Sequence, residues 1–344
     1  MKTTLLKTFL ALVWLSTLNS ELSTAHAQGA LTPPGAPAPM MKSLDQVEAR
    51  TPISAAPFTI NASGSYYLTT NLTTTVSNAI TIAVSGVTLD LNGFTIASTM
   101  ANAVNGGYAI LLGSGLSDLT ILNGHIRSGV TNSGVYAGSG FNYGIYYAGT
   151  APVNTRVSGV SVAGCLAYGI YLNIGDSTVV EACTVRTMGG HGIRASTIKS
   201  CVAVDCRTNA IYGDQVSDSR GESTGSGYGL YASSAANDYG SSISGTGLRG
   251  GSAQNCSGYS STGIGLDAAM AQNCYGESNG LGLQSQGNAN NCWGYSSFGT
   301  AMSALNASYC TGYRPGGTAI QATIATGCIA LNGTNIITYK YNMP

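Results

Sequence analysis

The chain has 344 residues with 14 Lys and Arg against 14 Asp and Glu, so only 8% of its residues are charged. This sparse, balanced charge excludes an electrostatic grip on nucleic acid or an anionic membrane, and the basic groove that a strongly acidic polysaccharide needs. With 47 Gly and 20 Tyr against 5 Phe, the composition indicates tight turns and exposed phenols within one elongated domain.

Residues 1–27 have the pattern of a secretory signal peptide. Lys2 and Lys7 supply a positive start, residues 9–18 an apolar run, and Ala25-His26-Ala27 a small-x-small cleavage site. The apolar run is too short to cross a bilayer, and no later segment offers about 20 apolar residues. We therefore expect a secreted protein, extracellular, at the cell surface or periplasmic, without a membrane span.

Residues 28–57 are expected to form a linker followed by a lead-in. The spacer LTPPGAPAPM is rich in Pro and Ala, which is typical of an extended linker. The following segment, KSLDQVEARTPIS, is too short to be a domain. We expect it to cap the first coil of the domain, because an open strand edge invites pairing with other chains.

Residues 58–161 are expected to form long coils with loops. Alternating β-branched runs broken by Gly and Asn, such as NAITIAVSGVTLDLNGFTIAS, indicate strands. The pairs Asn92-Gly93 and Asn123-Gly124 lie 31 residues apart, so coils of this length must project loops, which we predict over residues 97–108 and 128–152. The second predicted loop carries five aromatic residues, Tyr136, Phe141, Tyr143, Tyr146 and Tyr147.

Residues 162–344 repeat every 18 residues, and cysteines mark the repeat. The cysteines at 201 and 256 are separated by three such steps plus one residue, and Ser219 and Asp238 stand where the two missing cysteines would fall. A fixed period in this range is typical of a solenoid, in which each coil buries its apolar face against its neighbours. The marking cysteines are Cys165, Cys183, Cys201, Cys256, Cys274, Cys292, Cys310 and Cys328.

The repeat unit predicts an all-β fold, a parallel β-helix. Its consensus, A-x-N-C-x-G-x-S followed by turn residues and G-x-G-L-x-A, alternates small or apolar residues with polar or aromatic ones, as in strands with one buried face. We expect two short strands per coil, with a third near the Ala, and a narrow interior filled by one bulky column. That column comprises Ile193, Ile211, Leu230, Leu248, Leu266, Leu283, Met302 and Ile320.

The polar and sulfur-bearing columns carry separate predictions. Side chains stacked in register point the same way, which favours a column of buried free thiols, while disulfides between adjacent coils stay an open alternative. Cys206 lies off this column. No C-x-x-C pair occurs and the chain has three His, so we predict no zinc site. A further column should link its amides along the axis: Asn237, Asn255, Asn273 and Asn291.

The opening coils carry a family resemblance. SGSYYLTTNLT followed by ITIAVSGVTLDLNGFTI, with KSLDQVEARTPIS before them, resembles the start of secreted right-handed parallel β-helix proteins of the pectate-lyase-like superfamily. The resemblance covers residues 42–129 and implies a right-handed helix. A left-handed hexapeptide helix would need an aliphatic residue every six positions, whereas the third position after Cys holds Tyr, Glu or Arg.

Outward-facing aromatic residues are the candidate ligand-binding residues. The first and third positions after Cys should face solvent together, and exposed rings on a flat sheet can stack on the apolar faces of sugars. The competing interpretation is that these rings merely pack along the strand ladder. The candidate residues are Tyr239, Tyr259, Tyr275, Trp293, Tyr295 and Tyr313.

Two groups of charged residues are further candidates for a functional site. The repeat register brings Arg186, Asp205, Arg207 and Glu222 to one surface, where acids alternating with Arg indicate a solvated patch of ion pairs. In polysaccharide lyases of the resembling superfamily, clustered acids hold Ca²⁺ and an Arg or Lys acts as base. Near the predicted loops, the second group comprises Asp90, His125 and Arg127. Neither group supports a catalytic, metal-binding or cofactor assignment.

Three hypotheses for function follow. The first is a non-catalytic secreted solenoid that binds a polysaccharide or cell-surface glycan, or serves as a structural or adhesive module. The second is a polysaccharide lyase or glycoside hydrolase that works through loops over the early coils. The third is a homo-oligomer assembled side by side through the tyrosine face.

Overall fold

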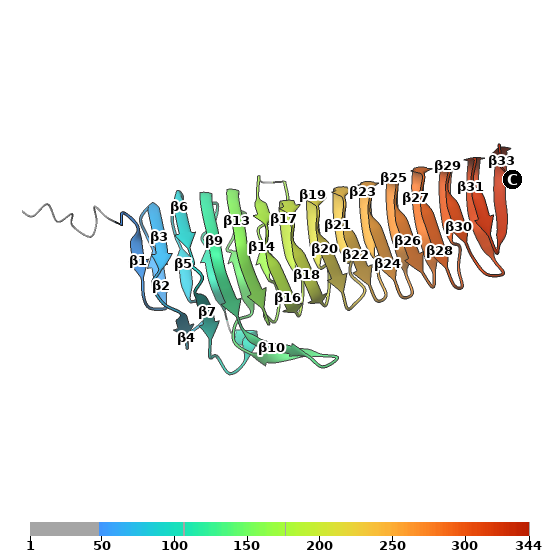
Figure 1. Cartoon of the computed structure of the whole chain (residues 1–344). Coiled ribbons are helices and arrows are strands. Elements are labelled where there is room, and N and C mark those ends of the chain that lie inside the picture. Colours follow the sequence, from blue (N-terminus) through green and yellow to red (C-terminus); the bar gives the residue numbers. More distant parts are fainter. Residues whose placement is uncertain (1–47, 106, 176, 344) are drawn as a thin grey trace, which may run out of the picture. The chain divides into compact units, whose positions relative to one another are not determined.

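A computed structural model of the protein describes residues 48–105, 107–175 and 177–343, and the predicted signal peptide and the Pro-rich spacer lie outside them. The unit from Arg50 onward is a right-handed parallel β-helix, which confirms the predicted fold. Its described strands form one 31-stranded sheet, with β10 and β11 pairing separately. Figure 1 shows the coils side by side from β1 to β33.

The first part of this unit, up to Ala163, has long coils. Ile80 pairs with Ile110 and Ile110 with Ile145, partners 30 and 35 residues apart in the chain. Its elements are β1 (Thr51–Ile53), β2 (Phe58–Ile60), β3 (Gly64–Leu68), β4 (Leu72–Thr74), β5 (Ile80–Ile82), β6 (Val87–Asp90), β7 (Thr95–Ser98), η1 (Ala103–Asn105), β8 (Tyr108–Leu112), β9 (Ser117–Arg127), β10 (Gly129–Asn132), β11 (Tyr136–Ser139), β12 (Tyr143–Tyr147) and β13 (Val153–Ala163).

The second part has short, regular coils, most of which alternate a long strand with a short one. The short strands that follow the cysteine column are β16 (Thr184–Met188), β18 (Val202–Cys206), β20 (Arg220–Ser223), β22 (Tyr239–Ser242), β24 (Ser257–Ser260), β26 (Tyr275–Ser278), β28 (Trp293–Ser296), β30 (Thr311–Tyr313) and β32 (Ile329–Leu331). The remaining strands are β14 (Ile170–Tyr171), β15 (Val179–Glu181), β17 (Ile193–Lys199), β19 (Ile211–Ser217), β21 (Leu230–Ala236), β23 (Leu248–Gln254), β25 (Ile264–Gln272), β27 (Leu281–Asn290), β29 (Met302–Ser308), β31 (Thr318–Thr326) and β33 (Thr334–Tyr341).

The bulky core column is confirmed. Each of its eight members aligns with the next through the pairing of successive long strands, as Leu230 does with Leu248 and Leu248 with Leu266. All eight are fully buried. The expected third strand near the Ala is the second half of each long strand, where Ala235 and Ala253 also face inward.

Paired glycine columns make the interior narrow. Gly258 on a short strand faces the backbone of Gly265 across the coil, and a Cβ added at Gly258 would lie 2.2 Å from the Gly265 carbonyl oxygen. Real Cβ atoms do not approach backbone oxygen this closely. The glycine of the repeat consensus is therefore required because the two walls of the coil almost touch there.

The cysteine column is buried and its thiols are free. Ser219 and Asp238 occupy the two predicted gaps, since the Cys201 amide donates to Ser219 Oγ at 3.1 Å and the Ser219 amide to Asp238 Oδ1 at 2.8 Å. The thiols donate to backbone carbonyls, as Cys274 Sγ does to Ala253 O at 3.3 Å. Burial makes these cysteines small apolar residues with a weak donor.

We expect the native protein to resist thiol reagents. All nine thiols are buried, so a reagent has no path to them, and burial also raises the pKa of Cys165 to about 12, which disfavours its reactive thiolate at neutral pH. Labelling with iodoacetamide, counted by mass spectrometry, should modify none of the nine cysteines in buffer and all nine in denaturant. Rapid native labelling, or a disulfide-linked peptide in the non-reduced digest, would contradict the free-thiol column.

Cys206 belongs to a second inner column. It aligns with Met188 before it and Ser223 after it, and Asp205, with φ 54°, forms the irregularity that turns its side chain inward. In later coils this column is Ser. Ser260 Oγ there donates to Gly245 O at 2.7 Å and accepts from the Gly263 amide at 2.9 Å, which fixes the adjacent turn.

The asparagine column forms the predicted amide ladder. The side-chain amide of Asn255 donates to Asn237 at 3.2 Å, Asn273 to Asn255 at 3.2 Å, and Asn291 to Asn273 at 2.9 Å. All four residues have positive φ, between 51° and 59°. Asn tolerates this left-handed conformation, so each residue both turns the chain and links its coil to the next.

The predicted loop over residues 128–152 is wrong in its second half. Tyr143, Tyr146 and Tyr147 lie on β12, which pairs with β8 inside the main sheet, and Phe141 is fully buried in the core. Only β10 and β11 leave the sheet, as an antiparallel hairpin (Figure 1). The non-periodic spacing of these coils hid a strand whose pairing partner lies 35 residues earlier.

Candidate functional site

Four of the six candidate rings gather on one outer surface. The register of β26, β28 and β30 aligns Tyr275 with Trp293 and Tyr295 with Tyr313. Together they line a shallow depression of about 470 Å³, which we call the aromatic platform. Because inward positions of these strands hold Gly and Ser, the alternating outward positions present the rings to solvent.

The platform rings are ordered by contacts among themselves and with neighbours. Tyr295 and Tyr313 stack at 5.5 Å between centroids with an interplanar angle of 10°. Tyr275 donates its hydroxyl to Glu277 Oε2 at 2.7 Å, and burial together with this carboxylate raises its pKa. Trp293 is 43% exposed, more than the other three residues of the platform. The surface therefore offers a largely apolar area with phenol groups at its border.

The other two candidates lie apart from the platform. Tyr239 has the Arg220 guanidinium over its ring, 5.1 Å from the centroid. Tyr259 is 37% exposed and aligns with Glu277, and Glu277 aligns with Tyr295 in the next coil. Neither lines the depression, so the structure groups the six predicted residues as four plus two.

A larger aromatic surface was missed by the sequence analysis. It runs over the outer side of β8, β12, β14, β17, β19 and β21, and we call it the tyrosine stripe. Ring centroids 4.4 to 5.9 Å apart connect many of its members, from Tyr108–Tyr143 at 4.8 Å to Tyr212–Tyr231 at 4.4 Å. Its tyrosines are Tyr108, Tyr143, Tyr146, Tyr147, Tyr168, Tyr171, Tyr212, Tyr228 and Tyr231.

Two arginines extend the tyrosine stripe. Arg194 lies between the rings of Tyr171 and Tyr212, 5.1 Å from each centroid, and its Nη1 donates to the Tyr171 hydroxyl at 2.8 Å. Arg249 donates to the Tyr228 hydroxyl at 2.9 Å and pairs with an Asp267 carboxylate oxygen at 3.5 Å. Partial burial and neighbouring phenols raise the pKa of Tyr146 to about 12, so the phenols stay neutral at physiological pH.

The signal for this stripe is present in the sequence. The residue after each core-column residue faces outward, and it reads Tyr171, Arg194, Tyr212, Tyr231 and Arg249 in successive coils. This column is separate from the one after Cys, which carries the six predicted residues. Its earliest members could not be aligned because their coils are irregular.

In the predicted group of Arg186, Asp205, Arg207 and Glu222, the two carboxylates bind residues outside the group. Glu222 pairs with Arg220, whose Nε donates to it at 2.7 Å. Asp205 instead binds the β10–β11 hairpin, accepting from Tyr136 Oη and Asn132 Nδ2, each at 2.7 Å. The carboxylate therefore anchors a structural element.

The group near the early loops is likewise divided. Asp90 forms an ion pair with Arg50 at 3.0 Å and accepts the Asn92 amide at 2.8 Å. His125 Nδ1 lies 2.6 Å from Ser161 Oγ, beyond the left-handed turn at Asn123. These contacts assign Asp90 and His125 to separate local networks.

Within residues 48–105, 107–175 and 177–343, no three His, Cys, Asp or Glu side chains are grouped so that they could hold a metal ion. In the same part of the chain, no helix has the length and apolar character to traverse a bilayer.

The fold and its aromatic surfaces define the class of the protein, a right-handed parallel β-helix with stacked rings on two outer faces. Comparison with known proteins yields no match to a family model, a curated protein or a solved structure.

Proposed function

We propose that this protein is a secreted or surface-associated, non-catalytic carbohydrate-binding solenoid that uses the aromatic platform to hold a polysaccharide or cell-surface glycan. As part of the same proposal, the resemblance of the opening coils supports a relationship to the pectate-lyase-like β-helix proteins. The observation that carries the proposal is the gathering of Tyr275, Trp293, Tyr295 and Tyr313 in one exposed depression.

The chemistry of the platform favours a sugar ring. Pyranose rings present C–H groups on their faces and hydroxyls at their edges, which complement aromatic faces bordered by phenols. Tyr and Trp lose little conformational entropy on binding, and the rigid sheet orients them before the ligand arrives. The stacked pair Tyr295 and Tyr313 holds these two rings in a fixed orientation beside Trp293.

Removing two rings should abolish most of the binding. A glycan array on the purified mature chain selects the ligand, and calorimetry then compares the wild type with Trp293→Ala/Tyr295→Ala. We expect an affinity loss of about tenfold or more, because each stacked ring contributes about 0.5–1.5 kcal/mol beyond its buried area. Phe298→Ala is the matched control, since this ring is 79% exposed and lies outside the depression.

Two outcomes would contradict the proposal. Unchanged affinity in Trp293→Ala/Tyr295→Ala would show that the rings only pack along the ladder. Release of unsaturated or reducing ends from the bound glycan, with or without added Ca²⁺, would show that the protein is an enzyme.

A further inference from the structure

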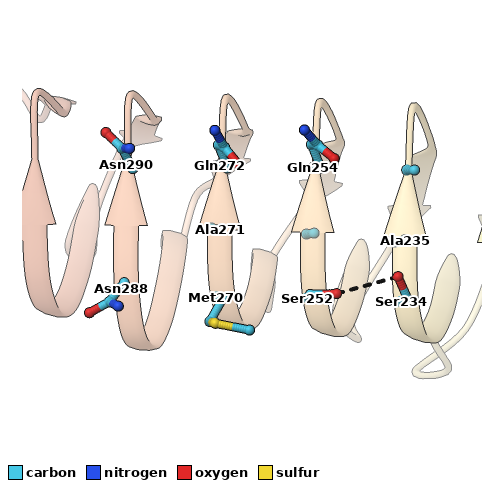
Figure 2. Close-up of a pocket in the computed structure, with 11 residues that line it drawn as sticks. Ser234, Ala235, Ser252, Gln254, Met270, Ala271, Gln272, Asn288 and Asn290 are labelled. Atoms are coloured by element: carbon cyan, nitrogen blue, oxygen red, sulfur yellow. Dashed lines mark hydrogen bonds between the residues drawn. The ribbon is translucent and has the colours of Figure 1, made fainter.

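A second groove runs along the outer side of β21, β23, β25 and β27, on a different face from the aromatic platform. It has a volume of about 340 Å³, and no charged side chain lines it. Figure 2 shows Gln254, Gln272 and Asn290 along one border, near the ends of their strands, and Ser252 and Met270 along the other. We call this the amide groove.

The register of the coils builds the groove. Gln254 aligns with Gln272 and Gln272 with Asn290, so one amide recurs at each coil, with a spacing of roughly 4.8 Å. The floor is the strand backbone at Ala253 and Ala271, whose small side chains are buried in the core. A backbone floor between a row of amides and a border of Ser, Met and Asn side chains is therefore repeated along the axis.

The border amides differ from the asparagine ladder. In the ladder each amide is bonded to the next coil, whereas the exposed side-chain amides of Gln254, Gln272 and Asn290 have no hydrogen-bond partner among the described residues. Their donors and acceptors are held by a rigid sheet in one row. Such a row can bond a ligand that offers hydroxyl groups at a matching repeat.

We propose that the amide groove binds a neutral polysaccharide chain lying along the solenoid axis, so that each protein molecule holds two glycan chains. Neutrality follows from the uncharged lining, and a hydroxyl-rich chain from the row of exposed amides along its border. The coil repeat is close to the length of one sugar residue in an extended chain. The claim that each molecule holds two chains rests on the proposed function of the platform. The claim that the groove binds a chain does not.

The two surfaces meet at one corner of the coil. Gln272 and Tyr275 are separated only by Asn273 and Cys274, and the left-handed turn at Asn273 directs the two strands onto different faces. Two chains bound there would lie on either side of the asparagine ladder. The protein would then cross-link neighbouring polysaccharide chains in a wall or matrix.

The test measures each site in the absence of the other. Cellohexaose, xylohexaose and mannohexaose are titrated by calorimetry into Trp293→Ala/Tyr295→Ala, which leaves the groove intact. We expect residual binding by at least one probe, weakened about tenfold by adding Gln254→Ala/Gln272→Ala, since each change removes a hydrogen-bonding group. Gln284→Ala/Gln321→Ala, two outward-facing amides outside the groove, is the matched control and should leave the affinity unchanged.

Chain length and bridging give independent readouts. The groove spans four coils, roughly 14 Å, so affinity should stop rising after three or four sugar units. Beads coated with the bound polysaccharide should agglutinate with the wild type and not with either double variant. Circular dichroism on each variant confirms that these exposed substitutions leave the fold intact.

The outcomes separate the two proposals. If the platform variant loses all binding, or if the groove changes have no effect in it, the groove site is overturned and the platform stands. If Gln254→Ala/Gln272→Ala loses all binding while the platform is intact, the groove site stands and the claim of two bound chains is overturned. If no probe binds the wild type, the groove site is overturned, and the platform is then decided by the glycan array. A wild-type dimer in light scattering that Gln254→Ala/Gln272→Ala dissociates would show that the groove binds a second copy instead.

Discussion

Gly258→Ala should unfold the C-terminal coils at temperatures where the wild type is intact. The added methyl carbon would lie 2.2 Å from Gly265 O, 2.7 Å from Gly265 C and 2.9 Å from Leu266 Cβ. Two of these are backbone atoms that cannot rotate away, so the walls of the coil must separate. We expect a loss of about 3 kcal/mol or more, the upper range for overpacking a core.

A second glycine in the same region provides the control. Gly250 aligns with Ala232 and Ala268 in neighbouring coils, and an added Cβ there would come no closer than 3.1 Å to another atom, Ser252 O. Gly250→Ala should therefore change stability by less than about 1 kcal/mol. Thermal unfolding followed by circular dichroism compares the two variants, and hydrogen exchange locates the coils affected. Equal stability of the two variants would refute the close-packed interior.

The stability of the protein should fall as the pH rises from about 4 to about 7 because of Asp238. This residue occupies the cysteine column, is 3% exposed, and burial raises the pKa of its carboxyl to about 7 despite hydrogen bonds from two backbone amides. The folded state thus binds this proton more tightly than the unfolded state, whose pKa is near 3.8. The stabilising contribution is complete below about pH 4 and is lost as the pH rises through 7.

Replacing the carboxylate should remove this dependence. Asp238→Ser reproduces Ser219 of the preceding coil, which accepts a backbone amide at the equivalent position. Between pH 4 and pH 8 the wild type should lose about 2–4 kcal/mol more than Asp238→Ser, from the size of the pKa shift. Urea denaturation at several pH values measures the difference. Asp218→Asn, an exposed change in the neighbouring turn, should keep most of the wild-type slope, because the Asp218 charge is the smallest of the causes that raise the pKa of Asp238. A slope as flat as that of Asp238→Ser would contradict the assignment.

The regular part of this solenoid was predictable because the period of its sequence equals the length of one coil. In a parallel β-helix, residues one period apart lie above one another, so counting from Cys256 to Cys274 locates neighbours in space. The bulky column, the buried thiols and the asparagine ladder all follow from that count. The gaps at Ser219 and Asp238 were found in the same way.

The candidate site was predicted less completely. Alternation along the short strands showed that Tyr275, Trp293, Tyr295 and Tyr313 face outward, and the structure groups them. The tyrosine stripe was missed because half of it lies on irregular coils. The amide groove was missed because nothing in the sequence distinguishes Gln254 and Gln272 from other exposed residues. Only the structure shows a row of small residues between them and a second border.

Sequence by itself determined that this chain winds into stacked coils of 18 residues and which side chains line their interior, because burial imposes the same residue type at every turn. Only the tertiary structure decided the course of residues 128–152, where Tyr143 joins the sheet and the Tyr136 hairpin docks on Asp205. Those contacts join residues 35 and 69 positions apart without any repeat. Their placement depends on which distant strand offers free hydrogen-bonding groups, and that is a property of the folded sheet.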